Sequence, residues 1–206
     1  MSMILNEPDT ETPSHRSRGG IIGAVVGLHN RVFRAITAAA NDWLTGFSAR
    51  FMFASVLLFY YLNSGWQKLG EGIFGFLNPS LGAYASILPS VMEQYGYDQT
   101  AIPFFPYGMI VYAGTWTELI LPILIVIGLF SRLAALGMIG FVIVQTYVDI
   151  NFHGLEDKFV GSMFDRLQDA VVWDQRLLWV FVLAIIVING PGRLSLDHFL
   201  GRRYRS

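Results

Sequence analysis

The sequence predicts an all-α integral membrane protein built as a four-helix bundle. Hydrophobic residues make up 53% of the 206 residues and charged residues only 14%, and the mean hydropathy is +0.48. Soluble domains carry about 25% charged residues. Four apolar stretches approach or exceed the length that crosses a hydrocarbon core of roughly 30 Å, about 20 helical residues. We therefore expect spans at about residues 51–68, 107–130, 133–149 and 172–189.

Two segments precede the first span. Residues 1–19 are polar, contain prolines and glycines and lack helical periodicity, which predicts a disordered head. Residues 20–49 are apolar but carry Arg31 and Arg34. We interpret them as an amphipathic helix on the membrane surface, with its arginines towards lipid phosphates. A signal peptide is the alternative, but the apolar run 21–28 is short and has basic residues on both sides.

The connections between the spans differ in length. Little more than Ser131 and Arg132 joins the second span to the third, so these two spans must form an antiparallel hairpin. The loop 69–106 is rich in Phe, Tyr, Leu and Pro, and we expect it to form one or two short helices that cap the bundle as a structured outer loop. After the fourth span, Ser195 can cap a short amphipathic helix, which a basic tail at 201–206 follows.

Arginines predict the orientation. The two longer loops between spans, 69–106 and 150–171, hold only Lys158 and Arg166 among seven acidic residues. The positive-inside rule therefore places both termini in the cytoplasm. The arginines on which this depends are Arg16, Arg18, Arg31, Arg34, Arg50, Arg132, Arg193, Arg202, Arg203 and Arg205. Aromatic residues expected near the outer interface are Trp66, Tyr107, Trp173 and Trp179.

Glu118 lies near the middle of the second span, where a carboxylate costs several kcal/mol unless it is neutral or paired. Pro122 has no N–H, so the Glu118 carbonyl loses its helical partner. Residues three, four or seven apart share a helix face, and three spans carry a polar stripe in their outer halves. These stripes should converge inside the bundle. The expected members of a polar pocket are Tyr60, Ser64, Gln67, Lys68, Thr115, Glu118, Gln145 and Asp149.

Lys68 is the expected partner of Glu118, because its long side chain can reach inward from the end of the first span. Three roles stay open for this pair. It can be a structural pair that fixes helix register, a polar pocket or proton-accepting site, or a contact with a partner subunit.

The third span has two further features. Asp149 and His153 lie one turn apart near the outer surface, and we interpret them as solvated residues, since two ligands are too few for a metal site. Ala134, Gly137 and Gly140 recur at spacing three, which is typical of a close helix contact.

Composition restricts the chemistry. The chain has no cysteine, which excludes disulfides, thiol catalysis and Cys-ligated metals or clusters within it. We expect no metal and no covalently bound cofactor. The net charge of −1 argues against nucleic acid as a partner. All four histidines lie outside the spans, so a bis-histidine haem in the core is excluded. Catalysis by this chain alone is not expected.

The chain from about residue 50 to residue 200 resembles the DoxX family of small four-helix bacterial membrane proteins. Three segments carry the resemblance: SGWQKLG (64–70), TELILPILIVIGLFSRLAALG (117–137) and NGPGRLSLDHF (189–199). Residues 1–49 look like an extension outside the family core. The family pattern places a glycine and a lysine after the first helix, an acid in the second and a glycine-rich ending. Here these are Gly65, Lys68, Glu118, Gly190, Pro191, Gly192, Arg193, Ser195 and Asp197.

The resemblance implies a location and a set of functions. It implies a multi-pass protein of the bacterial cytoplasmic (inner) membrane. Named relatives are associated with thiosulfate:quinone oxidoreductase and with oxidative-stress assemblies. The leading interpretation is a membrane subunit or accessory protein of a redox assembly, with quinone or lipid as ligand and other membrane subunits, or copies of itself, as partners. Any enzyme that it joins would be an oxidoreductase using quinone. A proton or small-molecule pathway and a structural subunit are the alternatives.

Overall fold

The computed structural model of this protein describes residues 20–40 and 43–203. Within these ranges it contains helices and turns, with one isolated β-bridge between Leu69 and Pro79. The chain divides into two compact units, one ending at Ala39 and the other beginning at Ala40. The predicted disordered head lies outside the described residues, as do the last three residues of the predicted basic tail.

In the described part of the first unit lies α1 (Ile21–Ala40), which has no buried residue. It is shorter than the predicted interfacial helix over 20–49. A separate helix, α2, begins at Leu44 and opens the first span, so residues 44–49 belong to the span. Arg50, one of the arginines that predict the orientation, follows these residues, and the structure buries its side chain at 8% exposure. Burial of this charge is possible because backbone carbonyls accept hydrogen bonds from its guanidinium.

Four helical segments of the second unit are long and apolar enough to cross a membrane, which confirms the predicted all-α membrane bundle. They cover Leu44–Gln67, Phe104–Ile127, Ser131–Asn151 and Val171–Asn189. The first span consists of α2 (Leu44–Phe53), a π-helical turn (Ala54–Leu58) and α3 (Phe59–Gln67). The others contain α6 (Met109–Ile127), α7 (Ser131–Asn151) and α9 (Leu177–Asn189), and short π-helical segments (Phe104–Gly108 and Val171–Arg176) precede α6 and α9. The remaining helices are α4 (Leu81–Ile87), α5 (Pro89–Gln94), α8 (Asp157–Val160) and α10 (Leu196–Arg203).

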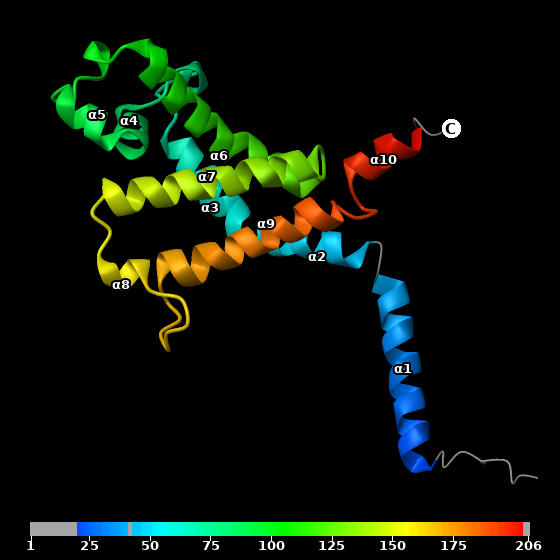
Figure 1. The fold of residues 1–206 in the computed structure, drawn as a ribbon. Coiled ribbons are helices and arrows are strands. Elements are labelled where there is room, and N and C mark those ends of the chain that lie inside the picture. The colour runs from blue at the N-terminus through cyan, green and yellow to red at the C-terminus, as the bar shows by residue number, and fades with distance from the viewer. Residues whose placement is uncertain (1–19, 41–42, 204–206) are drawn as a thin grey trace, which may run out of the picture. The chain divides into compact units, whose positions relative to one another are not determined.

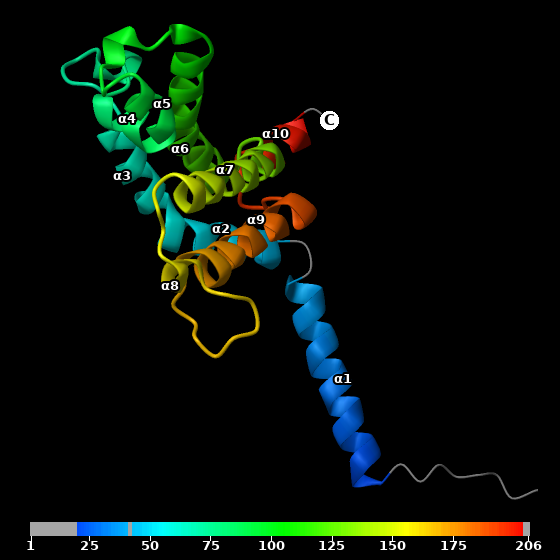
Figure 2. The same cartoon turned by 60° about the vertical axis from the view of Figure 1, so that its left-hand side comes forward.

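The first span changes its packing partner at the π-helical turn. α2 packs against α9, whereas α3 packs against α6, and α7 contacts both α6 and α9. A π-helical turn inserts an extra residue and redirects the helix. Figures 1 and 2 show the result: α3 and α6 run together and diverge from α7 and α9. The bundle is therefore closed at one end and splayed at the other.

Two short helices form a lobe at the splayed end. The Ser80 hydroxyl caps α4 by accepting from the Ala83 N–H at 3.2 Å, and Pro89 occupies the first turn of α5. Met92 of α5 is fully buried and packs in one cluster with Val111 of α6. The predicted short helices of the loop 69–106 are thus confirmed, and we call α4 and α5 with their flanking turns the lobe.

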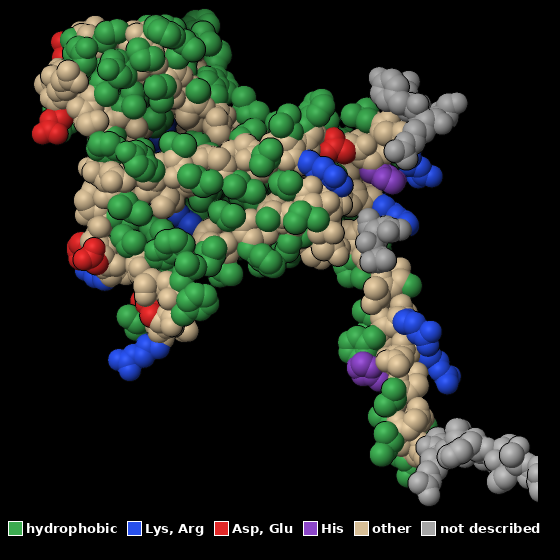
Figure 3. Space-filling view, in the orientation of Figure 1, with side chains coloured by type: hydrophobic (Ala, Val, Ile, Leu, Met, Phe, Trp, Pro, Cys, Tyr) green, Lys and Arg blue, Asp and Glu red, His purple; other side chains and the backbone are tan. Residues whose placement is uncertain are grey.

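Apolar side chains cover the sides of the spans. Phe59, Leu133 and Leu178 are 76%, 70% and 64% exposed, and Figure 3 shows hydrophobic side chains spread over the spans rather than gathered in one patch. Such a surface is stable in contact with lipid chains. The buried cluster between the spans is smaller and includes Phe53 and Met138.

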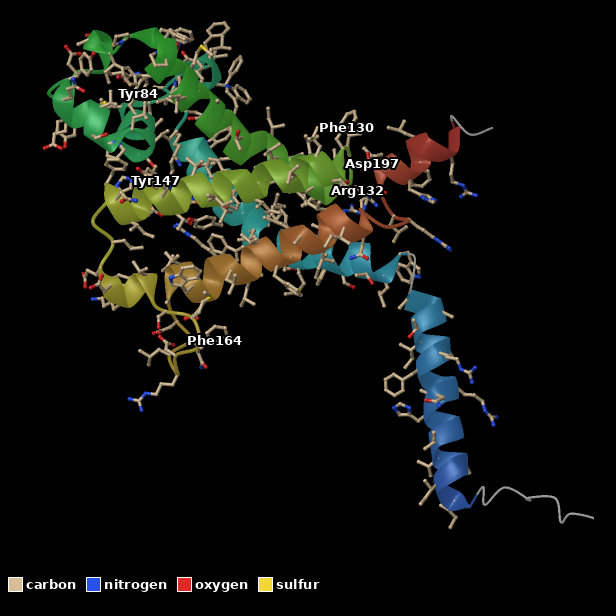
Figure 4. The ribbon with its side chains drawn as sticks, viewed as in Figure 1. Tyr84, Phe130, Arg132, Tyr147, Phe164 and Asp197 are labelled. Carbon is tan, nitrogen blue, oxygen red and sulfur yellow. The ribbon has the colours of Figure 1, made fainter. Side chains whose placement is uncertain are left out.

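Asp197 ties the C-terminal segment to the turn between the second and third spans. Its carboxylate accepts hydrogen bonds from the Phe130 N–H at 2.7 Å and from the Ser131 N–H and hydroxyl, both at 2.9 Å. It therefore caps the start of α7, where backbone donors have no helical partner. The Asp197 N–H in turn donates to the Gly128 carbonyl at 2.8 Å. Figure 4 shows Phe130, Arg132 and Asp197 together at this end of the bundle.

Arg50 completes this junction from the first span. Its guanidinium donates to the carbonyls of Ile125 at 3.0 Å and of Val126, which lie in the last turn of α6. It also donates to the carbonyls of Pro191 at 2.9 Å and Leu194 at 2.6 Å. Helix ends leave such carbonyls unpaired. One buried arginine thus joins three segments, and we call the Arg50 and Asp197 contacts the clasp.

Candidate functional site

Lys68 and Glu118 form an ion pair between α3 and α6. The Lys68 ammonium lies 2.7 and 2.9 Å from the two Glu118 oxygens and 2.7 Å from the Ser64 hydroxyl oxygen. The two side chains are only 10% and 5% exposed. The predicted proximity of Lys68 and Glu118 is confirmed. All three ammonium hydrogens have an acceptor, as burial of the charge requires.

Gly65 explains how the lysine comes close enough. A Cβ at this position would lie 2.8 Å from the Leu119 side chain and 3.3 Å from the Glu118 Cβ. Only a residue without a side chain allows α3 to approach α6 this closely. Lys68 then follows at the C-terminal end of α3, within reach of the Glu118 carboxylate.

A second ion pair joins α7 to the start of the fourth span. The Arg176 guanidinium bonds to the Asp149 carboxylate and donates to the Thr146 hydroxyl at 2.9 Å. The Arg176 side chain is 6% exposed and that of Asp149 is 26% exposed. Our interpretation of Asp149 as a simply solvated residue is therefore wrong, because a cation from the fourth span pairs with it.

Tyr60 and Gln145 connect the first and third spans. The Gln145 amide donates to the Tyr60 hydroxyl at 3.2 Å. The Gln145 amide oxygen is buried and has no partner among the described residues. The Tyr60 ring also lies 5.4 Å from the Trp179 ring, centroid to centroid. This wall thus offers the hydroxyl hydrogen of Tyr60 as a donor to the cleft, while the Gln145 amide oxygen is buried within the wall.

A cleft of about 540 Å³ lies between α3, α6, α7 and α4, and it is lined by the Lys68–Glu118 pair, by Tyr60 and Gln145 and by Asp149, but not by Arg176. That volume falls within the range of small-molecule sites, roughly 300–1,000 Å³. Ile110 and Val144, which lie on α6 and α7 and line the cleft, are 46% and 59% exposed. The cleft therefore reaches the lipid-facing side of the bundle. Figure 3 shows basic side chains set back in hollows below the lobe, among hydrophobic ones.

Glycines make the room for this cleft. Gly114, Gly137 and Gly140 all line it. The Ile87 side chain of α4 lies 2.9 Å from a Cβ built on Gly114, so the lobe closes the cleft there. A Cβ on Gly140 would meet no atom within 4 Å. The predicted helix contact at Gly140 is thus wrong: the missing side chain leaves space in the cleft instead. Gly137 does contact α6, through Leu121.

A family model for DoxX matches residues 47–153. The chain belongs to the DoxX family. The match covers the first three spans and includes the glycine, lysine and acid of the first ion pair. No curated protein and no solved structure matches the chain.

Six of the eight predicted pocket residues of this DoxX protein line the cleft. They are Tyr60, Ser64, Lys68, Glu118, Gln145 and Asp149. Gln67 does not, because it precedes Lys68 by one residue on the helix and is turned to the exposed side beside the 69–76 loop. Thr115 is 1% exposed and lies in the buried stripe of α6, where its hydroxyl has no partner among the described residues.

Sequence reasoning missed Arg176. The signal was present, since an arginine near the start of an apolar span needs an acidic partner or a backbone acceptor. The nearest acid in the sequence, Asp174, was not predicted as its partner either. In the structure the Asp174 carboxylate accepts from the Ala170 N–H at 2.9 Å, which leaves Asp149 of α7 for the arginine.

The glycine-rich ending of this DoxX protein lies at the other end of the bundle from the cleft. Its residues line a separate hollow with Arg132: Gly190, Pro191, Gly192, Arg193, Ser195 and Asp197. A Cβ on Gly190 would lie 3.2 Å from the Arg132 guanidinium. The ending thus builds the clasp. Among the described residues, no group of three or more His, Asp or Glu side chains is placed to hold a metal ion.

Proposed function

We propose that this DoxX-family protein binds a neutral, lipid-soluble ligand of the quinone class in its cleft, as a subunit or accessory protein of a redox assembly. One observation carries the proposal: a largely apolar cleft, open towards lipid, is lined by the buried Lys68–Glu118 pair, the Tyr60–Gln145 pair and the Asp149 carboxylate, which Arg176 neutralises. A ligand that dissolves in the bilayer can enter from its side without crossing water.

Charge balance favours a neutral ligand. Lys68 and Arg176 carry two positive charges, and Glu118 and Asp149 carry two negative ones. A charged head group would have to displace one of these partners and leave a buried charge unpaired, which typically costs 3–5 kcal/mol. A carbonyl or hydroxyl group disturbs neither pair.

The hydrogen-bonding groups suit both redox forms of a quinone. The Tyr60 hydroxyl hydrogen can donate to a quinone carbonyl. The Asp149 carboxylate, which lines the cleft and is partly exposed, can accept from the hydroxyl of a quinol. The chain has no cysteine for an iron–sulfur cluster, so electrons would reach the ligand from a partner subunit. On this proposal the protein positions a substrate and does not catalyse alone.

The test uses Gly140. Gly140→Leu places a side chain in the empty space of the cleft, whereas Gly140→Ala adds one methyl group there. Wild type and both variants are purified with their native lipids, and bound quinone is measured by mass spectrometry and by rebinding of ubiquinone-1 in nanodiscs. We expect wild type and Gly140→Ala to hold quinone and Gly140→Leu to lose it. Equal quinone content in all three, or none in any, would refute the proposal.

A second candidate is a proton pathway through Glu118. The observation in its favour is that the buried hydroxyls of Tyr61 and Thr115 have no partner among the described residues. Thr115 lies one turn from Glu118 on α6. Proteoliposomes separate the two functions: Glu118→Gln should abolish proton uptake in a pathway, while Gly140→Leu should leave that uptake intact.

We also propose that the clasp end faces the cytoplasm of a bacterial inner membrane, with both termini on that side. Arg132 and Arg193 lie together there, at the hollow lined by the ending motif. Basic residues near span ends are retained on the cytoplasmic side. Tags at the two termini should resist a protease added to intact spheroplasts. Cleavage of either tag from outside would overturn this orientation.

A further inference from the structure

We infer that α1 lies in the plane of the bilayer as a second, peripheral membrane contact, bound to anionic lipid through one face. This inference does not depend on the proposed ligand. The helix has an apolar face, and none of its residues is buried. The members of that face are Ile21, Ile22, Val25, Val26, Leu28, Val32, Phe33 and Ile36, each between 44% and 85% exposed.

Apart from His29, the apolar and polar side chains of α1 lie on different faces. At 100° per residue, Val25 and Val32 lie near the centre of the apolar arc, and Gly27 and Ala38 lie on the opposite side. His29 is the one polar residue within the apolar arc, where its ring packs against that of Phe33 at 4.4 Å. A helix with apolar and polar residues on different faces buries the apolar face in the head-group region and keeps the polar face in water.

The charges of α1 indicate what its apolar face binds. The polar side carries Arg31 and Arg34, and no acidic residue occurs anywhere in α1. Two such basic residues beside an apolar face fit a bilayer with anionic head groups, which attracts surface arginines by about 1 kcal/mol each, a factor of roughly fivefold in binding. A second copy of α1 would bring like charges together and gain no opposite charge.

The position of α1 in the sequence also supports binding to the bilayer. α1 ends at Ala40 and the first membrane span begins at Leu44. So short a connection holds α1 at the membrane surface at a high effective concentration. Trp43 immediately precedes the span, and tryptophan is enriched at the head-group level. Crossing the membrane is excluded for α1 itself, since Arg31 and Arg34 would then lie in its middle.

The absence of cysteine allows a direct test. Single cysteines are introduced at Val25 and Val32 on the apolar face and at Gly27 and Ala38 on the polar face of the full-length protein. Each is labelled with a fluorophore in vesicles of phosphatidylcholine and phosphatidylglycerol. We expect labels at Val25 and Val32 to be quenched by lipid-borne quenchers to an equal degree, and labels at Gly27 and Ala38 by iodide in water.

Three other outcomes would overturn the inference. A helix that crosses the bilayer would give depths that change along the chain rather than between faces. A helix paired with a second copy would protect Val25 and Val32 from both quenchers and bring labels on two molecules together. A helix free in water would expose all four labels to iodide.

Two charge variants show whether the apolar face itself is responsible. Val32→Asp adds a carboxylate to that face, and Asn30→Asp adds the same group outside it. With the label at Val25, we expect Val32→Asp to abolish lipid quenching and Asn30→Asp to retain most of it. Equal quenching in both variants would contradict one-sided binding. Quinone content, measured on the same samples, should not change, so this outcome is separate from that of the proposed function.

Discussion

Removing one partner of the Lys68–Glu118 pair should destabilise the bundle, whereas replacing both should not. The ammonium lies 2.7 and 2.9 Å from the two carboxylate oxygens, and the side chains are 10% and 5% exposed. At an effective dielectric constant of about 20, charges at this separation attract by about 6 kcal/mol. Withdrawal of two ions from water costs several kcal/mol for each ion, so the net contribution of the pair is near zero.

The single variants remove the attraction but keep one desolvated charge. Lys68→Met and Glu118→Met should therefore each lower the free energy of unfolding by about 3–5 kcal/mol. The double variant Lys68→Met/Glu118→Met, with two unbranched side chains of similar length, should stay within about 1–2 kcal/mol of wild type. The coupling energy of the cycle is then at least about 4 kcal/mol, since two single losses do not add.

Denaturant unfolding in mixed micelles, followed by far-UV circular dichroism, measures all four free energies. Ser64→Ala provides a control of smaller effect, because it removes only the neutral acceptor of the Lys68 ammonium. Additive single effects, with a coupling energy below about 1 kcal/mol, would show that the two charges do not depend on each other. The pairing would then have no energetic role.

Three further outcomes follow from the geometry. Asp197→Ala should remove the cap of α7 and cost about 1–2 kcal/mol in the same unfolding assay, and Asp197→Asn should cost less. Gly65→Ala should cost about 1–3 kcal/mol, because its Cβ would press on the Leu119 side chain, whereas Gly140→Ala should be neutral or stabilise α7 by up to about 1 kcal/mol. Burial, with a smaller contribution from Tyr112, raises the pKa of Tyr84 above its usual 10.0. Its contribution to stability is therefore present below about pH 10 and lost as the pH rises through the higher folded-state pKa, and Tyr84→Phe should remove this loss in an alkaline titration of lobe unfolding.

The pairing of Lys68 with Glu118 could be predicted from the sequence because a charge in a membrane span needs a partner. The same rule applies to Arg176, but the sequence does not show which acid pairs with it. Asp174 and Asp149 are both candidates by type, and only the packing of α7 against the fourth span selects Asp149. The sequence thus predicts that a buried charged residue has a partner of opposite charge, but not which residue that partner is.

Helix periodicity also has a limit that Thr115 and Gln67 illustrate. It groups residues on one face but does not say whether that face meets a neighbouring helix or an open cleft. Thr115 shares the stripe of Glu118 and faces the core, while Gln67 lies beside Lys68 in sequence and faces outward. Only the packing of the spans against one another decides this.

The sequence by itself determined that the chain is a four-span, all-α membrane protein, because apolar length and scarce charge leave no other way to satisfy the backbone in lipid. It also determined the first buried ion pair. Only the tertiary structure decided the start of the first span, the clasp and the cleft. Arg50 lies inside the protein because carbonyls at the end of α6 and in the 191–194 segment converge on it. Such partners come from segments distant in sequence, and no local pattern records that they will meet.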